Sequence, residues 1–210
     1  MHRKRLGKID IQMERDHIDL LAFAGHKGLM GPQGTGVLIS KQDYGLEPLI
    51  HGGTGTHSEL ERQPEQWPER YEACTLNTPG IAGLLAGVQA IKEKGIDSIR
   101  SHEEELMRTF IEGLTKLEYV TCYGPRDLQK RVAVVSFHVE HISSHEIAMI
   151  LDSTYQIAVR AGLHCSPKTH KYLKTIDEGL VRVSFGPYNT MDQVERLLDA
   201  VKEITEAFTN

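Results

Sequence analysis

Cysteine, aromatic residues and long apolar runs are all scarce in this chain. Its 210 residues include only Cys74, Cys122 and Cys165, and an odd number of widely spaced cysteines excludes a disulfide framework. We therefore expect a reducing, cytoplasmic environment. No apolar run approaches the roughly 18 residues of a membrane span. No apolar segment follows the basic residues 1–5, so a signal peptide is not expected either.

Charge of neither sign dominates the composition. Charged residues make up 25% of the chain and hydrophobic residues 40%, and the formal net charge is -5. This balance is typical of a soluble globular chain with one large or two small domains. A net negative charge argues against nucleic acid or an anionic membrane as the main partner.

Apolar periodicity predicts alternating strands and helices. Strands are expected over 20–24, 37–39, 120–123, 132–139, 157–160 and 180–185, and helices over 78–95, 98–117, 143–154 and 191–208. The first helix should present one apolar face, formed by Ile81, Leu84, Leu85, Val88 and Ile91. Residues 51–77 lack periodicity and are rich in glycine, proline, threonine and glutamate, which predicts a long loop of the kind that is usually functional or mobile. A domain boundary is expected within 81–95, followed by a βαβ-rich C-terminal domain.

Lys27 lies in the segment 25–28, at the end of an apolar run over 20–24 that predicts a buried strand, and a glycine-rich turn over 31–36 follows. Desolvation disfavours the ammonium form of a lysine in such a place. A depressed pKa would free the amine to form a Schiff base with a carbonyl such as that of pyridoxal phosphate. The alternative is a lysine that extends from a strand end into water.

Cys165 lies in a predicted loop bounded by Gly162 and Pro167, with His164, Arg160 and Lys168 nearby in sequence. Positive neighbours favour a thiolate, so this cysteine is a candidate nucleophile. The alternative is a small buried hydrophobic side chain, as for most free cysteines. Cys74 and Cys122 lack such neighbours and are interpreted as structural.

Arg182 lies on a predicted strand that places it on the same face as Ser184. Its guanidinium could bind a substrate carboxylate through two parallel hydrogen bonds, or pair with a partner at the surface. A metal site is not expected, because neither histidine group has a closed four-ligand spacing. The groups are His138, His141 and His145, and His164, Cys165 and His170. The segment 31–36 is not a nucleotide-binding P-loop, since no Lys-Ser or Lys-Thr pair closes it.

Four blocks, taken in order, resemble the class V aminotransferases, and among them the cysteine desulfurase and selenocysteine lyase branch. They are DLLAFAGHK with the following GPQGTG, EACTLNTPGI, RAGLHC, and VRVSF with YNT; these begin at Asp19, Glu72, Arg160 and Val181. Their order and spacing cover nearly the whole chain. The resemblance implies a pyridoxal 5'-phosphate-dependent enzyme that removes sulfur from L-cysteine, leaving alanine and an enzyme persulfide. The same amino-acid clamp would also suit selenocysteine or cysteine sulfinate.

The resemblance also implies roles for individual residues. Lys27 would be the Schiff-base lysine and the base at the substrate α-carbon, and His26 would contact the cofactor phosphate. Thr75 would reach the phosphate of a neighbouring subunit's cofactor, which implies a homodimer. Arg182 would hold the α-carboxylate. Cys165 would attack the sulfur, which a sulfur-acceptor protein could then receive.

Several positions depart from the family's pattern. The aspartate that pairs with the pyridine nitrogen lies in a D-x-x-Q-x-x-G pattern, and aligning Gly7 with its glycine puts Met1 and Lys4 at the aspartate and glutamine positions. Ala24 stands where many relatives have a serine or threonine for the phosphate, and Cys74 replaces the glycine before the threonine. Each departure weakens the predicted cofactor pocket.

The implied fold is α/β, the C-terminal part of a fold type I aminotransferase. Residues 1–90 would be the remainder of the large cofactor-binding domain, without its N-terminal half, and residues 91–210 the small C-terminal domain. A partial chain of this kind should expose apolar sheet surface. Two hypotheses follow: a truncated desulfurase-like enzyme, and a non-catalytic remnant or split-gene fragment that at most dimerises or binds a partner.

Overall fold

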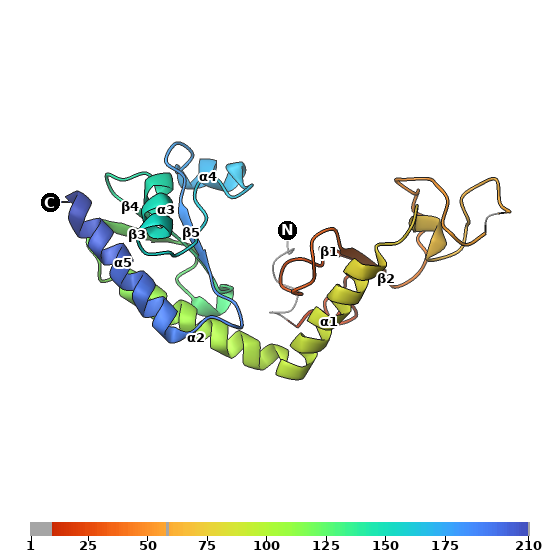
Figure 1. The fold of residues 1–210 in the computed structure, drawn as a ribbon, viewed down its shortest axis with the longest axis horizontal. Helices are drawn as coiled ribbons and strands as arrows, with labels where there is room; N and C mark the ends of the chain where they lie inside the picture. The colour runs from red at the N-terminus through yellow and green to blue at the C-terminus, as the bar shows by residue number, and fades with distance from the viewer. Residues whose placement is uncertain (1–9, 58, 210) are drawn as a thin grey trace. The chain divides into compact units, whose positions relative to one another are not determined.

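The chain folds into two compact units, which are described one at a time. The computed structural model describes residues 10–57 and 59–209. The first unit extends to Ile96 and the second runs from Asp97 to Asn210 (Figure 1). The interpretation of residues 1–90 and 91–210 as large-domain remainder and small domain stays a prediction.

The first unit is built on one antiparallel strand pair. The strands β1 (Leu20–Ala24) and β2 (Gly36–Ser40) pair from Leu20 opposite Ser40 to Ala24 opposite Gly36. Both predicted strands are confirmed, but β1 is not buried as predicted, because Leu20 is 38% exposed. A sheet of two strands has few neighbours to cover its faces, so apolar side chains of β2 are exposed as well, at Leu38 and Ile39.

The predicted loop between β2 and the first helix is confirmed. Between Ser40 and Thr78 the described residues form a single 3-10 turn, η1 (Glu69–Tyr71), and Figure 1 shows this segment looping out beyond the strand pair. Gln63 ties part of it together: its side-chain NH2 donates to the carbonyl oxygen of Glu69 at 2.8 Å, and its side-chain oxygen accepts from Gly52 N–H at 3.2 Å. Polar side chains therefore supply bonds that no strand ladder provides here.

Helix α1 (Thr78–Lys94) begins and ends as its sequence predicts. The side chain of Asn77 accepts from Gly80 N–H at the N-terminus, and Gly95, with φ 82°, ends the helix. Its buried face differs from the predicted apolar face and consists of Gly80, Leu84, Gly87 and Ile91. Ile81, Leu85 and Val88 are exposed. The helix packs through its glycines because these allow the helix backbone to approach the segment after Lys27.

The second unit has an antiparallel sheet of order β3–β4–β5. These strands are Val120–Tyr123, Val134–Val139 and Val181–Ser184. Val120 lies opposite Val139, and Phe137 lies opposite Val181. The βαβ prediction is therefore wrong for the described strands, since apolar content identifies a strand without giving its direction.

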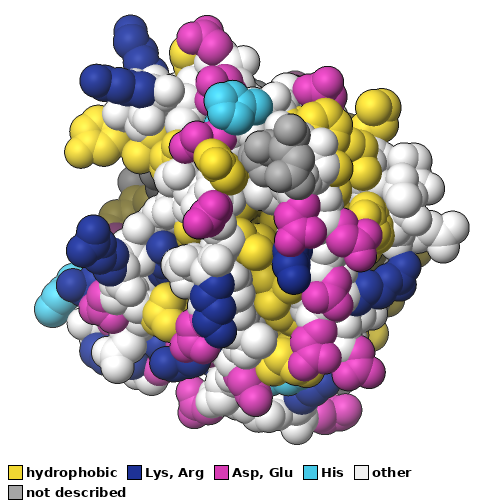
Figure 2. Space-filling model, turned by 90° about the vertical axis from the view of Figure 1, so that its left-hand side faces the viewer, with side chains coloured by type: hydrophobic (Ala, Val, Ile, Leu, Met, Phe, Trp, Pro, Cys, Tyr) yellow, Lys and Arg dark blue, Asp and Glu magenta, His cyan; other side chains and the backbone are white. Residues whose placement is uncertain are grey.

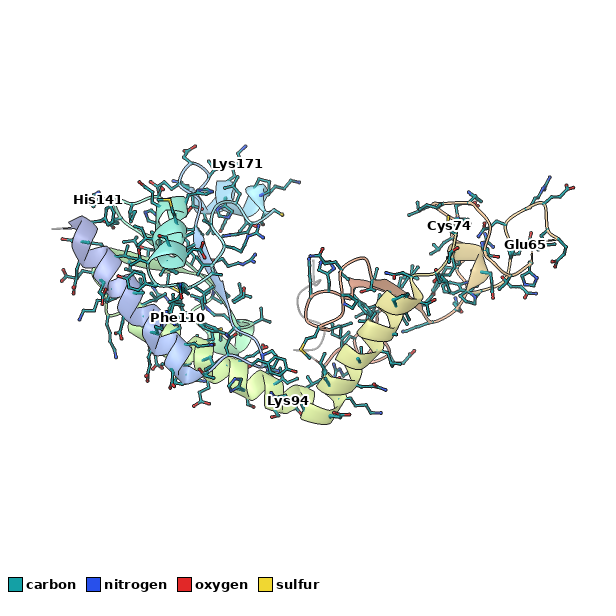
Figure 3. The ribbon with its side chains drawn as sticks, viewed as in Figure 1. Glu65, Cys74, Lys94, Phe110, His141 and Lys171 are labelled. Atoms are coloured by element: carbon teal, nitrogen blue, oxygen red, sulfur yellow. The ribbon has the colours of Figure 1, made fainter. Side chains whose placement is uncertain are left out.

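Helices pack against this sheet to form the core. They are α2 (Ile96–Leu114), α3 (Ser144–Ser153) and α5 (Met191–Thr209). The unit also has a short helix α4 (Pro167–Leu173) and a 3-10 turn η2 (Leu128–Lys130). Phe110 of α2, labelled in Figure 3, is fully buried between Phe137 and Phe185, with ring centroids 6.0 and 5.6 Å away. Side chains of α3 and α5 complete the same cluster. The core is thus continuous from helix to sheet to helix.

Of two neighbouring elements predicted in this unit, the helix over 143–154 is confirmed and the strand that follows it is not. Ser143, the first residue of the range predicted for this helix, caps α3 in a capping box: its side chain accepts from Glu146 N–H while the Glu146 carboxylate accepts from Ser143 N–H. The strand predicted over 157–160 is wrong: only Arg160 pairs, through an isolated bridge to Arg182. Helix α4 was not predicted, because a seven-residue helix carries too little periodicity to be recognised.

Charges of both signs are interspersed over the face drawn in Figure 2, with hydrophobic side chains between them. None of the helices within residues 10–57 and 59–209 is long and apolar enough to cross a membrane.

Gly87 should be intolerant of a side chain. A Cβ at this position would lie 2.3 Å from the carbonyl oxygen of Leu29, which is backbone and cannot move aside cheaply. We expect Gly87→Val to lower the free energy of unfolding of the first unit by about 1–3 kcal/mol, measured by chemical denaturation. The control is Ala86→Val, the same β-branched residue at an exposed position of α1. Equal effects of the two substitutions would contradict the packing described here.

Candidate functional site

Lys27 lies on a tight turn that directly follows β1. Its carbonyl oxygen accepts from Met30 N–H at 2.9 Å, and Gly31 N–H donates to the carbonyl oxygen of Gly25 at 2.9 Å. Gly25 N–H in turn donates to the carbonyl oxygen of Thr35, the residue before β2, also at 2.9 Å. These bonds close the turn on itself, so the backbone that carries Lys27 is fixed by both strands.

A groove of about 840 Å³ opens beside this turn, within the first unit. Lys27 and His26, both exposed, contribute its basic side chains. Its walls combine polar and apolar groups, among them Phe23, Trp67, Asn77 and Ile81. A concave surface with aromatic walls and a few polar groups is typical of a site for a small molecule.

Trp67 and Tyr71 form an aromatic pair at this groove that sequence reasoning missed. Their ring centroids are 4.7 Å apart in an edge-to-face arrangement, and the Tyr71 hydroxyl donates to the carbonyl oxygen of Leu46 at 3.1 Å. Tyr71 is therefore tied to the loop that follows β2. Both residues fall in the aperiodic segment 51–77, where the sequence pattern does not indicate which side chains turn inward.

Thr75 is exposed, between Glu72 and Leu76, which both line the groove. The neighbouring Cys74, labelled in Figure 3, lies in the loop that precedes α1. Its φ is 67°, and its N–H donates to the carbonyl oxygen of Gly53 at 2.7 Å. The glycine that the resemblance implies at this position would suit such a backbone, and the cysteine adopts the left-handed conformation at a cost of about 1–2 kcal/mol.

In the second unit Cys165 is exposed on a loop between the Arg160 bridge and α4, as predicted. Both His164 and Cys165 have left-handed backbones, with φ of 52° and 58°. Such a conformation costs about 1–2 kcal/mol for each residue other than glycine. Ser166 N–H donates to the carbonyl oxygen of Leu163 at 2.8 Å and closes the loop.

Arg182 of β5 lies beside this loop. Its backbone N–H donates to the carbonyl oxygen of Arg160 at 2.7 Å, and Arg160 N–H donates back at 3.2 Å. The Nε atom of Arg182 is buried, with no hydrogen-bond partner in the described chain. Burial lowers the pKa of Arg182, the charge of Arg160 lowers it further, and Cys165 acts in the opposite direction. Arg182 and Cys165 are therefore close enough to interact electrostatically.

His164 lies close to Arg160 and Arg182. Burial is the main cause that lowers the pKa of His164, with smaller contributions in the same direction from Arg182, His170 and Arg160. A hydrogen bond to the carbonyl oxygen of Arg160, at 3.2 Å from Nε2, acts the other way. Arg160 and Arg182 supply the positive charge here, which suits a negatively charged ligand.

The other predicted positions are dispersed. His138 on β4 pairs with Glu178 at 3.4 Å, His141 lies in the turn after β4 (labelled in Figure 3), and His145 is on α3. Among residues 10–57 and 59–209, no three His, Cys, Asp or Glu side chains are grouped as a metal site. Met1, Lys4 and Gly7 lie outside the described residues.

The predicted site residues thus fall into two groups. Lys27, His26 and Thr75 belong to the first unit, and Cys165 and Arg182 belong to the second. The roles assigned to them by resemblance stay predictions.

Comparisons with known proteins agree with the four sequence blocks. The family model described as aminotransferase class-V matches residues 4–197. A protein named probable cysteine desulfurase from Pyrococcus abyssi is 41% identical over 96% of this chain and 50% of its own length. One from Methanothermobacter thermautotrophicus is 34% identical over 95% of this chain and 50% of its own. The chain therefore spans about half the length of the curated relatives it matches.

Solved structures show the same relationship. The apo structure of a cysteine desulfurase from Thermococcus onnurineus matches with a TM-score of 0.89 at 40% identity, over 97% of this chain and 51% of that one. The cysteine desulfurase CsdA from Escherichia coli, in an S-sulfonic acid form, matches with a TM-score of 0.88 at 26% identity, over 99% of this chain and 51% of that one. These neighbours support the α/β, fold type I interpretation.

The lowered pKa of His164 predicts a specific dependence of stability on pH. The imidazole of His164 has its ordinary pKa of about 6.5 in the unfolded chain and a lower pKa in the folded protein. As pH falls through this interval, the unfolded state binds a proton before the folded state does, so the free energy of unfolding decreases. We expect wild type to lose more unfolding free energy than His164→Asn between about pH 7.5 and about pH 5.5. Asparagine tolerates the left-handed backbone and does not titrate. Parallel stability curves for the two proteins across this range would refute the prediction.

Proposed function

The chain belongs to the class-V aminotransferase family, and from this premise we propose that it is a cysteine desulfurase-like protein. It would bind pyridoxal 5'-phosphate, remove sulfur from L-cysteine, release alanine and retain the sulfur as a persulfide on Cys165. The observation that carries the proposal is the exposure of Cys165, on a left-handed loop, within electrostatic reach of Arg182. That pairing supports a thiol nucleophile beside a carboxylate-binding group.

The residues of the first unit fit the cofactor that class-V aminotransferases use. The groove beside Lys27 is concave, has aromatic walls and presents the exposed lysine amine together with His26. Lys27 would hold the cofactor through its Nζ atom, and His26 and Thr75 would contact phosphate, Thr75 that of a neighbouring subunit. When bound, the cofactor supplies an electron sink for charge developing at the substrate α-carbon.

The protein's own groups would divide the remaining work. Arg182 would bind the α-carboxylate of cysteine through its two-pronged guanidinium, and its unpartnered Nε supplies a donor for this contact. The Nζ atom of Lys27 would move the proton at the α-carbon. The thiolate of Cys165 would form a bond to the substrate sulfur as the carbon–sulfur bond breaks. That bond's electron pair would stay with the substrate carbon, which gains a proton and becomes the methyl group of alanine.

The domain roles and partners belong to the same proposal. The first unit would be the remainder of the large cofactor-binding domain, and the second would be the small domain. Exposed apolar side chains near Thr75, namely Leu76 at 47% and Ile81 at 49% exposure, support contact with a second copy in a homodimer. An acceptor protein in the cytoplasm would take the sulfur from Cys165.

The alternative is a non-catalytic domain that dimerises or binds a partner. One observation favours it: apolar side chains of α1 and of the groove are open to solvent, with Leu85 57% exposed. A surface of this kind supports contact with further polypeptide. The next two experiments distinguish the alternatives.

Lys27 should capture the cofactor. When the purified chain is mixed with pyridoxal 5'-phosphate and reduced with borohydride, we expect mass spectrometry to find the added mass on the peptide containing Lys27. Lys27→Ala should reduce total labelling by about tenfold or more. The matched control is Lys41→Ala, a lysine of the same unit that pairs with Glu14 at 3.5 Å, which should label like wild type. Labelling spread evenly over many lysines would contradict a specific site.

Cys165 should be essential for sulfur transfer. With cofactor and L-cysteine, we expect Cys165→Ala to lower sulfide release, measured in the presence of a reductant, by about two orders of magnitude or more, because the proposal assigns the attack on the substrate sulfur to this thiol. Cys122→Ala is the control, since Cys122 is half-buried and its pKa is raised by that burial. No release by wild type would favour the non-catalytic alternative, and unchanged release by Cys165→Ala would exclude the nucleophilic role.

A further inference from the structure

The loop that carries Cys165 needs support from outside itself. His164 and Cys165 are consecutive left-handed residues, and neither is glycine, the residue that adopts this conformation without strain. Such a backbone persists only where surrounding groups hold it. The base of the loop is held first: Leu180 N–H donates to the carbonyl oxygen of Gly162 at 3.2 Å.

Close packing at Gly179 reinforces this base. A Cβ at Gly179, where φ is 66°, would lie 2.7 Å from the Cα of Gly162 and 2.8 Å from the Oγ of Ser144. Ser144 is fully buried and donates its hydroxyl to the carbonyl oxygen of Glu178 at 2.7 Å. The position of Gly162 is therefore set by backbone contact, while His164 and Cys165 lie further along the loop.

His170 of α4 supports the part of the loop that contains His164 and Cys165. It is 4% exposed, and its ring centroid lies 5.8 Å from that of His164, with the two rings tilted by 51°. Nδ1 of His170 lies 3.0 Å from the Thr175 hydroxyl oxygen and 3.3 Å from the Thr175 carbonyl oxygen. Because a carbonyl oxygen only accepts, an Nδ1–H donor satisfies both contacts.

Thr175 is itself held in place. It is buried, and its N–H donates to the carbonyl oxygen of His170 at 2.9 Å, while its own carbonyl oxygen accepts from Gly179 N–H at 3.0 Å. Gly179 is the residue that packs on the base of the loop. Thr175 therefore connects the ring of His170 to the same support that fixes Gly162.

We propose that His170 is a positioning residue for Cys165: the bond to Thr175 fixes the imidazole, and the fixed ring holds His164 in the left-handed conformation that presents Cys165. This deepens the proposed function and rests on it for the role of the thiol. An apolar ring in the same place would have no bond to fix its orientation. A side chain with a donor but no ring could keep the bond to Thr175 and would lose the contact with His164.

The test compares His170→Asn with wild type by peptide-resolved amide hydrogen exchange. Asparagine can keep a donor toward Thr175 and lacks the ring that faces His164. We expect exchange over 162–166 to accelerate about tenfold, while peptides from β4 and α5 exchange as in wild type. Tyr172→Ala, at an 86% exposed position of the same helix, should leave the loop unchanged.

Either of two results for His170→Asn would overturn the proposal. Unchanged exchange over 162–166 in His170→Asn would show that the ring does not hold the loop, and equal acceleration throughout the second unit would make His170 an ordinary core residue. A second pair of variants guards against loss of folding by His170→Asn. Thr175→Val removes the hydroxyl and should loosen the loop, whereas Thr175→Ser keeps the hydroxyl and should not; equal exchange in the two would also overturn the proposal.

An activity measurement separates positioning from binding. In protein that releases sulfide, His170→Asn should lower kcat about tenfold with KM unchanged, since the carboxylate contact at Arg182 is preserved while the thiol is misplaced. A rise in KM with kcat unchanged would overturn the positioning role. Absence of sulfide release by wild type would count against the proposed function, whereas the exchange experiment would still decide the role of His170.

Discussion

Close contact between backbone segments holds both parts of the candidate site in place. In the first unit, Gly87 allows α1 to approach the carbonyl oxygen of Leu29, which lies within the turn that carries Lys27. In the second, Gly179 packs on Gly162 at the base of the loop that carries Cys165. A side chain at either contact would separate the surfaces. Because protein interiors are densely packed, displacing the backbone at either glycine would also displace the segment that carries Lys27 or Cys165.

Regular elements with strong patterns could be predicted from the sequence. The alternating apolar residues of β4 and β5, and the long amphipathic repeat of α5, determine secondary structure by themselves. Strand direction and burial could not be predicted, because both depend on neighbours distant in sequence. The exposed Leu20 of β1 and the exposed Leu85 of α1 illustrate this. Each lies in an apolar pattern that predicts burial, and each is open to solvent in the structure.

The candidate site divides in the same way. Lys27, Cys165 and Arg182 were identified because chemically distinctive residues stand in blocks of recognisable order. The sequence suggests His170 only as a member of a histidine group. Its contacts with Thr175 and with the ring of His164 depend on the three-dimensional fold and could not be predicted. Left-handed backbones at His164 and Cys165 also leave no trace in residue type, since histidine and cysteine usually adopt other conformations.

The segment between β2 and α1 has a consequence for divergence within the family. Apart from η1, it contains no regular element among its described residues, and the side-chain bonds of Gln63 and the bond from Tyr71 to Leu46 stay within the segment itself. Doubling the length of a flexible loop costs only about 0.6 kcal/mol. Insertions and deletions can therefore accumulate here at little thermodynamic cost. The turn at Lys27 and the start of α1 stay in place because their own packing contacts hold them. Length variation among relatives should concentrate in this segment.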